Sequence, residues 1–295
     1  MGEPYNPADS PMNRSRPRSL PGLPRILRRG SRVLARPREQ ERLQPRLRVD
    51  AGAPELVLSP HWDDAALDCW SLLASDRELN VVNLFAGIPT AAKAGVWEAV
   101  IGASDPAERA RRRLREDAQA LRGAGREPLN LPLLDASYRR QQSIAVGLDE
   151  LDRALSAAVA AASRVYVPAG IGGHADHLLA RGYGRALLRA GMPVSVYAEL
   201  PYCIFHGWPS WVDGGDPQPD RDVDAYWQSF LRDVPEMPAL RTGEVQRLDA
   251  AAAQAKLEAI RCYRTSLNHS VRQLLSDPAF HALEVRWALV SRVTL

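Results

Sequence analysis

Short apolar runs alternate with longer amphipathic segments through most of this chain. An apolar run of about four to eight residues between polar or glycine-rich stretches predicts a buried strand, and apolar residues three or four apart predict a helix. The expected strands cover residues 56–59, 79–85, 129–134, 165–168 and 194–200. The expected helices cover residues 65–74, 105–123, 148–162 and 177–189.

The alternation of strand and helix signals predicts an α/β fold. Strands that alternate with helices favour parallel pairing, so we expect a Rossmann-like, mostly parallel sheet with helices on both faces. Asp105-Pro106-Ala107-Glu108 marks one helix start, because Asp caps a helix, proline suits its first position and Glu follows in its first turn. No GxGxxG motif opens a helix, so the fold does not imply a dinucleotide.

Residues 1–48 differ from the rest of the chain in composition. They hold 12 arginines and four acidic residues, although the net charge of the whole chain is only +3. Rich in proline and serine and poor in large apolar side chains, they are expected to be a disordered tail, with residues 49–295 forming one domain. A basic tail could contact nucleic acid or an anionic membrane. A solvated extension explains the same composition without a partner, and no nucleic-acid partner is expected.

Residues 203–240 interrupt the strand and helix pattern with many prolines and glycines. A stretch this long without regular structure is uncommon unless it is a lid or a binding loop, so we expect an irregular insertion that could cover the substrate. Its aromatic residues are Phe205, Trp208, Trp211, Tyr226 and Trp227. Their rings could stack on a sugar or an aglycone, or they could pack the insertion onto the sheet.

The three cysteines, Cys69, Cys203 and Cys262, form no CxxC pair. This argues against a disulfide framework and against a thiolate zinc site, and it makes a cytoplasmic location the default expectation. No apolar run reaches the roughly 18 to 20 residues needed to cross a bilayer, so no transmembrane segment is expected. The sequence does not indicate an oligomeric state.

Two short motifs carry the chemistry. Pro60-His61-Trp62-Asp63-Asp64 follows the expected strand at 56–59, and Gly173-His174-Ala175-Asp176-His177 follows the expected strand at 165–168. Each motif should therefore lie at the carboxyl end of a strand, where open α/β sheets bind ligands.

Catalytic zinc takes three protein ligands, usually imidazole and carboxylate, and keeps a position open. His61, Asp64 and His177 meet that demand. Asp63 would lie beside the metal as a general base, and His174, as an imidazolium, could stabilise an oxyanion or protonate a departing nitrogen. Each residue alone has a structural alternative, since an Asp-Asp pair often caps a helix. Two matching motifs at equivalent strand ends favour the metal site.

With these motifs the chain resembles the PIG-L/LmbE-like zinc-dependent N-deacetylases, over roughly residues 54 to 270. That family is marked by a His-Pro-Asp-Asp motif after the first strand and a later His-x-Asp-His motif. The resemblance implies zinc bound by His61, Asp64 and His177, with Asp63 as the base and His174 as the oxyanion partner. These are the roles argued above from chemistry.

Weaker similarities concern the substrate. Arg113 lies in a helix that fits the family, and Asp135 falls where members place a substrate-contacting aspartate, although a salt bridge or surface role is equally open for both. Asp176 is expected to orient a neighbouring histidine or cap its helix rather than bind metal. Residues 197–202 resemble the late strand of the family, and residues 256–267 resemble its closing helix.

Three positions depart from the family pattern. Trp62 replaces the usual proline, Ala65 stands where many members have glutamate, and Gly172 replaces a tyrosine that some members place near the acyl oxygen. Trp62 could offer a stacking face to a substrate beside the metal, or it could point into the core beneath the strand.

The resemblance implies a zinc-dependent amidohydrolase that removes the N-acetyl or similar N-acyl group from an amino sugar. We expect the sugar on a bacterial natural product or small glycoside. Two alternatives remain, a thiol-conjugate-type amidase and a catalytically silent, sugar-binding family member.

Overall fold

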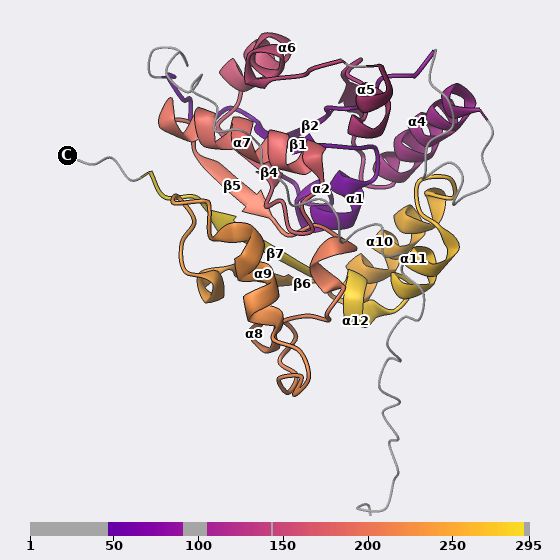
Figure 1. Cartoon of the computed structure of the whole chain (residues 1–295), viewed down its shortest axis with the longest axis vertical. Coiled ribbons are helices and arrows are strands. Elements are labelled where there is room, and N and C mark those ends of the chain that lie inside the picture. The colour runs from indigo at the N-terminus through magenta and orange to yellow at the C-terminus, as the bar shows by residue number, and fades with distance from the viewer. Residues whose placement is uncertain (1–46, 91–104, 143, 292–295) are drawn as a thin grey trace, which may run out of the picture. The chain divides into compact units, whose positions relative to one another are not determined.

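The computed structural model describes residues 47–90, 105–142 and 144–291, all of which belong to one compact unit (Figure 1). In this part of the chain seven strands form a single sheet in the order β3-β2-β1-β4-β5-β7-β6. The strands are β1 (Glu55–Ser59), β2 (Leu79–Asn83), β3 (Pro128–Asn130), β4 (Arg164–Pro168), β5 (Val194–Tyr197), β6 (Glu244–Arg247) and β7 (Leu283–Ala288). The first five strands pair in parallel, β7 pairs antiparallel to β5, and β6 pairs antiparallel to β7. The predicted α/β fold with a mostly parallel sheet is confirmed.

The central strands are buried on both faces. Leu56, Val57 and Leu58 follow one another in β1, and all three are almost completely buried. Successive side chains of a strand point to opposite faces, so both faces of the sheet must be covered. This is the burial expected of a parallel sheet between two layers of helices.

The helices pack in groups on this sheet. Within the first half of the described chain they are α1 (Asp64–Asp68), α2 (Trp70–Leu73), α4 (Pro106–Arg122), α5 (Ala136–Gln142) and α6 (Leu148–Ala160). In the second half they are α7 (Ala175–Arg189), α8 (Ser210–Asp213), α9 (Val223–Leu231), α10 (Ala250–Cys262), α11 (His269–Leu274) and α12 (Pro278–His281). Helix α7 packs on β4 and β5 with α6 against it, whereas α1 packs on β1 and α10 contacts both α1 and α4.

The structure differs from the expected elements in a few places. The helix predicted at 65–74 is divided at Cys69, whose φ of −129° leaves the helical region. The strand expected at 129–134 is reduced to β3, because Pro132 lacks the N–H that a continuing ladder needs. The helix start at Asp105 is confirmed, since its side chain accepts hydrogen bonds from the N–H groups of Ala107 and Glu108.

The boundary of the domain lies slightly before residue 49. The Leu47 N–H donates a 2.8 Å hydrogen bond to the Ala190 carbonyl, and the Leu47 side chain packs against the core. Residues 47 and 48 therefore belong to the domain rather than to the tail. The rest of the expected tail, residues 1–46, lies outside the described residues.

The segment 203–240 is more regular than its composition predicts, because it contains α8 and α9. Trp208 and Trp227 are buried, and Trp227 makes an edge contact with Trp287 of β7 at a centroid distance of 5.7 Å. These rings attach the segment to the sheet. The geometry thus favours packing over sugar stacking for both tryptophans.

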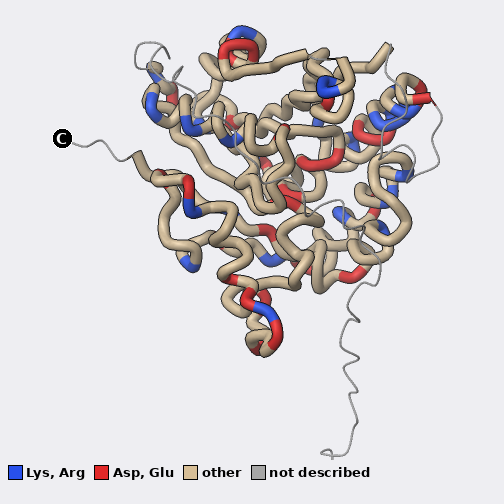
Figure 2. The backbone as a smooth tube through the Cα atoms, in the orientation of Figure 1, with Lys and Arg blue, Asp and Glu red and all other residues tan. Residues whose placement is uncertain are grey.

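Basic and acidic residues are interspersed along α4 (Figure 2). Arg111, Arg112 and Arg115 each form an ion pair with Glu108, at nitrogen to oxygen distances of 3.9, 3.0 and 3.4 Å. The arginines of this helix are therefore partly neutralised locally. Among the described residues, no helix is both long enough and apolar enough to span a bilayer.

Candidate metal centre

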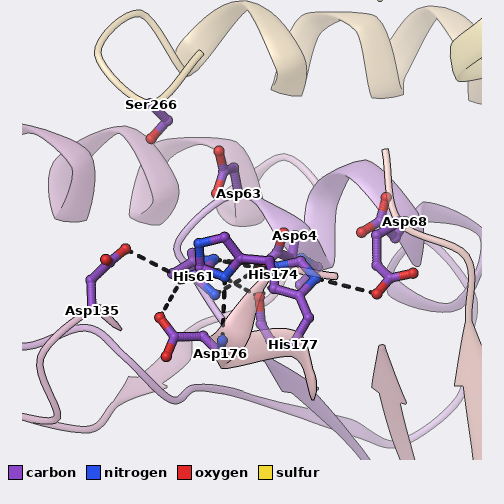
Figure 3. A network of polar contacts seen from close by, with 12 residues as sticks. His61, Asp63, Asp64, Asp68, Asp135, His174, Asp176, His177 and Ser266 are labelled. Atoms are coloured by element: carbon purple, nitrogen blue, oxygen red, sulfur yellow. Dashed lines mark hydrogen bonds and ion pairs between the residues drawn. The ribbon is translucent and has the colours of Figure 1, made fainter. Parts of the chain in front are cut away.

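The two motifs meet where β1 and β4 lie side by side. Strands β2 and β3 extend the sheet on one side of this pair, and β5 extends it on the other, so the chain reverses direction across the sheet between β1 and β4. Such a reversal opens a crevice at the carboxyl ends of the strands. His61 follows β1 there, and His174 and His177 follow β4 at the start of α7 (Figure 3).

Three ligand atoms converge in this crevice. His61 Nδ1 lies 3.3 Å from Asp64 Oδ2, Asp64 Oδ2 lies 3.4 Å from His177 Nε2, and His177 Nε2 lies 3.3 Å from His61 Nδ1. A tetrahedral zinc ion about 2.0 to 2.1 Å from each ligand would separate its ligands by about 3.3 to 3.4 Å. The triangle therefore has the dimensions of one face of a zinc coordination shell.

The hydrogen bonds on the outer sides of the two imidazoles are compatible with a cation at this triangle. His61 Nε2 lies 3.1 Å from Asp176 Oδ2, and His177 Nδ1 lies 3.3 Å from Glu199 Oε1. A neutral imidazole that donates to a carboxylate from one nitrogen presents a lone pair on the other. The two nitrogens that face each other, together with Asp64 Oδ2, would thus offer three lone pairs to one position.

Asp176 and Glu199 hold the two imidazoles in place. Both are fully buried, and a carboxylate behind a metal-binding histidine fixes its tautomer and ring orientation. Glu199 also accepts hydrogen bonds from the N–H groups of Gly170 and Ile171 in the loop after β4. The sequence motifs indicate Asp176 as a supporting residue, but they do not indicate Glu199. The one sequence feature that could have identified Glu199 is that a charged residue stands directly after a buried strand, between Ala198 and Leu200.

Asp176 is itself fixed by residues from α5. Its Oδ1 accepts a 2.6 Å hydrogen bond from Arg139 Nη2, and its Oδ2 accepts one of 2.9 Å from the Ala136 N–H. The Arg139 guanidinium also lies over the ring of Phe85, 4.6 Å from its centroid. Nothing in the sequence marked Arg139, because its role depends on the packing of α5 against the start of α7.

The electrostatics of the cluster favour positive charge. Burial lowers the pKa of His61, yet hydrogen bonds with Asp176 and Asp64 raise it well above its usual value. Burial likewise opposes protonation of His177, but Asp64 and Glu199 raise the pKa of this ring to about 9. The pKa of Asp64 falls well below its usual range because His177 and His61 outweigh the effect of burial. A cation bound at the triangle would supply positive charge to the same carboxylates.

Asp63 lies next to the triangle and is not one of its three corners (Figure 3). Its Oδ1 is 3.4 Å from Arg113 Nη2, and the carboxylate is largely buried. Burial raises the pKa of Asp63 above its usual value, although the Arg113 guanidinium opposes that rise. A carboxylate with a raised pKa is better suited to accept a proton.

His174 differs from the expectation of an imidazolium. It caps α7, where its Nδ1 accepts a 3.3 Å hydrogen bond from the Asp176 N–H. Burial, together with the neighbouring His61 and His177, lowers the pKa of His174 to about 4. These effects favour a neutral ring over the expected imidazolium at neutral pH. A neutral ring that accepts at Nδ1 carries its proton on Nε2 and can donate a hydrogen bond from there.

Trp62 and Arg113 form a buried pair. The indole is 3% exposed and its N–H donates a 3.1 Å hydrogen bond to Asn130 Oδ1. The Arg113 guanidinium lies over the indole, 5.0 Å from its centroid, while Arg113 Nε donates to Ser266 Oγ. The geometry favours an interior position for Trp62 rather than an exposed stacking face. It also favours a salt bridge for Arg113.

Asp135 faces the same crevice. Its Oδ2 is 3.4 Å from His61 Nε2, and its Oδ1 accepts hydrogen bonds from the N–H and hydroxyl of Ser137. His61 and His174 outweigh burial and lower its pKa below the usual value. With a side chain that is 18% exposed, Asp135 is an ionised group at the edge of the cluster.

Two other ligand combinations are possible on distance alone. His61, His174 and His177 offer atoms within 4.8 Å of one another, and so do His61, Asp135, His174 and Asp176. We prefer the triangle with Asp64 because its edges match the zinc geometry.

No family model matches the chain. It is 28% identical over 189 residues to a 2'-N-acetylparomamine deacetylase of Niallia circulans, covering 51% of this chain and 68% of the relative. It is 33% identical over 163 residues to a 2'-N-acetylparomamine deacetylase of Streptomyces fradiae, covering 50% of this chain and 57% of the relative. Thus the matched region spans about half of this chain.

Its fold is similar to that of a teicoplanin deacetylase whose crystal structure shows a zinc-inhibited form. The TM-score is 0.59 at 21% identity, and the match covers 82% of this chain and all of the solved one.

Proposed function

We propose, on the premise that this chain is a member of the PIG-L/LmbE-like deacetylase family, that it is a zinc-dependent N-deacetylase of an amino sugar. The observation that carries the proposal is the triangle of His61 Nδ1, Asp64 Oδ2 and His177 Nε2, with edges of 3.3 to 3.4 Å. Two imidazoles and one carboxylate form a donor set that zinc accepts in hydrolytic enzymes.

The residues around the triangle divide the work of amide hydrolysis. When bound, zinc would polarise the acyl carbonyl and make the attacking water more acidic. Asp63 accepts the proton of that water, which its raised pKa favours. His174 donates from Nε2 to the acyl oxygen as negative charge develops on it. The proton taken up by Asp63 is then available to the departing amine, so the products are a carboxylic acid and a primary amine.

The relatives supply the substrate class. Two act on 2'-N-acetylparomamine by name, and the structural neighbour is a teicoplanin deacetylase. We infer that this chain acts on an N-acetylated amino sugar carried by a bacterial natural product or a small glycoside. A cytoplasmic location agrees with its three cysteines, all of which are unpaired.

A substrate screen tests the proposal. The full chain, loaded with zinc, is incubated with N-acetylglucosamine, 2'-N-acetylparomamine, an N-acetylglucosaminyl glycopeptide and an N-acylated thiol conjugate, and primary amine is measured. Asp63→Asn serves as the matched control, since it retains the three proposed ligands. The proposal is supported if the parent releases amine from a sugar substrate and Asp63→Asn does not. Release from the thiol conjugate alone would favour the amidase alternative, and zinc binding without any turnover would favour a silent member.

A further inference from the structure

Tyr202 lies beside the ligand cluster, although it follows a different strand from either motif. It begins a short 3-10 helix after β5, η2 (Tyr202–Ile204). Its ring centroid is 5.5 Å from that of His177, at an interplanar angle of 83°, and 6.4 Å from that of His174. The ring therefore borders the crevice next to both histidines of the second motif.

A glycine makes room for this ring. A Cβ atom on Gly172 would lie only 2.7 to 2.9 Å from the Cβ, Cδ1 and Cγ atoms of Tyr202. The φ of +92° at Gly172 also disfavours any other residue. With Phe205 making an edge contact at 5.8 Å, the ring is held between the loop after β4 and its own segment.

The hydroxyl of Tyr202 has a different environment from other tyrosine hydroxyls of the protein. Those of Tyr183, Tyr197, Tyr226 and Tyr263 each donate to a protein oxygen. Within residues 47–90, 105–142 and 144–291, the Tyr202 hydroxyl has no hydrogen-bond partner. A phenol in a partly buried crevice normally finds one, so this donor is available to a bound molecule.

The charges that act on this phenol lie in the candidate metal centre. Burial is the largest cause that raises the pKa of Tyr202, and the carboxylates of Asp64, Asp63 and Asp135 add to it. A phenol has an ordinary pKa of about 10, so Tyr202 is a neutral O–H donor at neutral pH without any shift.

We propose that Tyr202 contacts the substrate and that its hydroxyl donates a hydrogen bond to the acyl oxygen, together with His174 Nε2–H. The inference rests on the proposed function and assigns a second donor to the same site. Negative charge accumulates on the acyl oxygen during attack by water, and neutral donors fixed at that position stabilise it more than they stabilise the resting amide. Loss of the Tyr202 hydroxyl should therefore lower kcat more than it changes KM.

Tyr202→Phe tests the proposal because it removes the hydroxyl and keeps the ring that fills the space at Gly172. We expect kcat/KM on the best N-acetyl sugar to fall by about tenfold or more, with zinc content and melting temperature unchanged. Tyr183→Phe is the matched control, since it removes a phenol that bonds Asp152 in α6. That control should keep the parental kcat/KM. Tyr202→Leu, which also removes the ring, should lose at least as much activity as Tyr202→Phe.

Acetate binding provides a readout that does not depend on turnover. Calorimetry on the zinc-loaded proteins should show weaker acetate binding to Tyr202→Phe than to the parent, by about threefold or more. An active parent with a Tyr202→Phe variant of equal kcat/KM would overturn the role of Tyr202 and leave the proposed function intact. If the parent released no amine from any substrate, the proposed function would fail. Equal acetate affinities would then overturn the role of Tyr202 as well.

Discussion

The two imidazoles of the candidate metal centre are supported in different ways. His61 is backed by Asp176, which comes from the other motif and is itself tied to Arg139. His177 is backed by Glu199, which is tied to two backbone N–H groups. One support is therefore a buried ion pair and the other a carboxylate held by main chain. Similar distances at the two imidazoles therefore rest on different interactions, and removing one support or the other should affect stability differently.

Removing a corner of the triangle should have the largest effect. His61→Ala, Asp64→Ala and His177→Ala should each lower the zinc content from about one ion per chain to near zero, because three ligands leave little redundancy. Elemental analysis of dialysed protein measures this. His269→Ala, a change of an exposed histidine, should keep its zinc. Zinc content equal to that of the parent in the three alanine variants would show that these residues are not the metal ligands.

Asp63→Asn should separate catalysis from metal binding. The amide cannot accept a proton, so turnover should fall at least about a hundredfold while zinc content stays at the parental level. Steady-state kinetics with parallel metal analysis checks both parts. Parental turnover in this variant would mean that another group is the base.

Changing the carboxylates behind the two imidazoles should weaken zinc binding less than removing a ligand does, and the two variants should differ in stability. Glu199→Gln and Asp176→Asn should each weaken zinc affinity by about 10 to 100-fold, since each misorients one imidazole. Only Asp176→Asn leaves a buried arginine without its charge partner, which costs about 3 to 5 kcal/mol, so it should lower the melting temperature more. Zinc competition titrations and thermal unfolding separate the two effects.

Glu236→Gln is the matched control for the support variants. Glu236 is a buried carboxylate that pairs with Arg185 of α7, away from the imidazoles. The Glu236→Gln variant should keep the zinc affinity of the parent. A drop in zinc affinity here would show that loss of any carboxylate near α7 disturbs the metal site.

Trp62→Phe should have a smaller effect, mostly on stability. The variant loses the hydrogen bond to Asn130, worth about 1 kcal/mol, which lowers the melting temperature by about 2 to 4 °C in a protein of this size. We expect kcat/KM on a small and a large substrate to change by the same factor. A change in substrate ranking would instead support the stacking role considered from the sequence.

Deletion of residues 1–46 should have the smallest effect. An arginine-rich and proline-rich segment with few large apolar residues contributes little to a core, so turnover on a small substrate should match that of the full chain. The cut is placed before Leu47 because its N–H bonds to Ala190. Loss of folding on truncation would contradict the tail prediction.

The central strands could be predicted from the sequence because they are apolar on both faces, and both motifs follow such strands. Strand β6, with the sequence Glu-Val-Gln-Arg, lies at the edge of the sheet and carries no comparable apolar run. Glu199 and Tyr202 escaped notice because their roles depend on β5 lying next to β4, which is a long-range contact. Burial, which the sequence does not report, favours a neutral His174 over the imidazolium expected from the sequence.

The wide separation of the ligands along the chain has a consequence for the order of folding. His61 and His177 are 116 residues apart, and their nitrogens meet only when β1 and β4 are paired. Closing so long a loop in an unfolded chain costs entropy before any ligand is gained, so an ion has little to bind until the sheet has formed. Zinc should therefore be captured by an already folded protein, unlike small domains whose folding is driven by the metal.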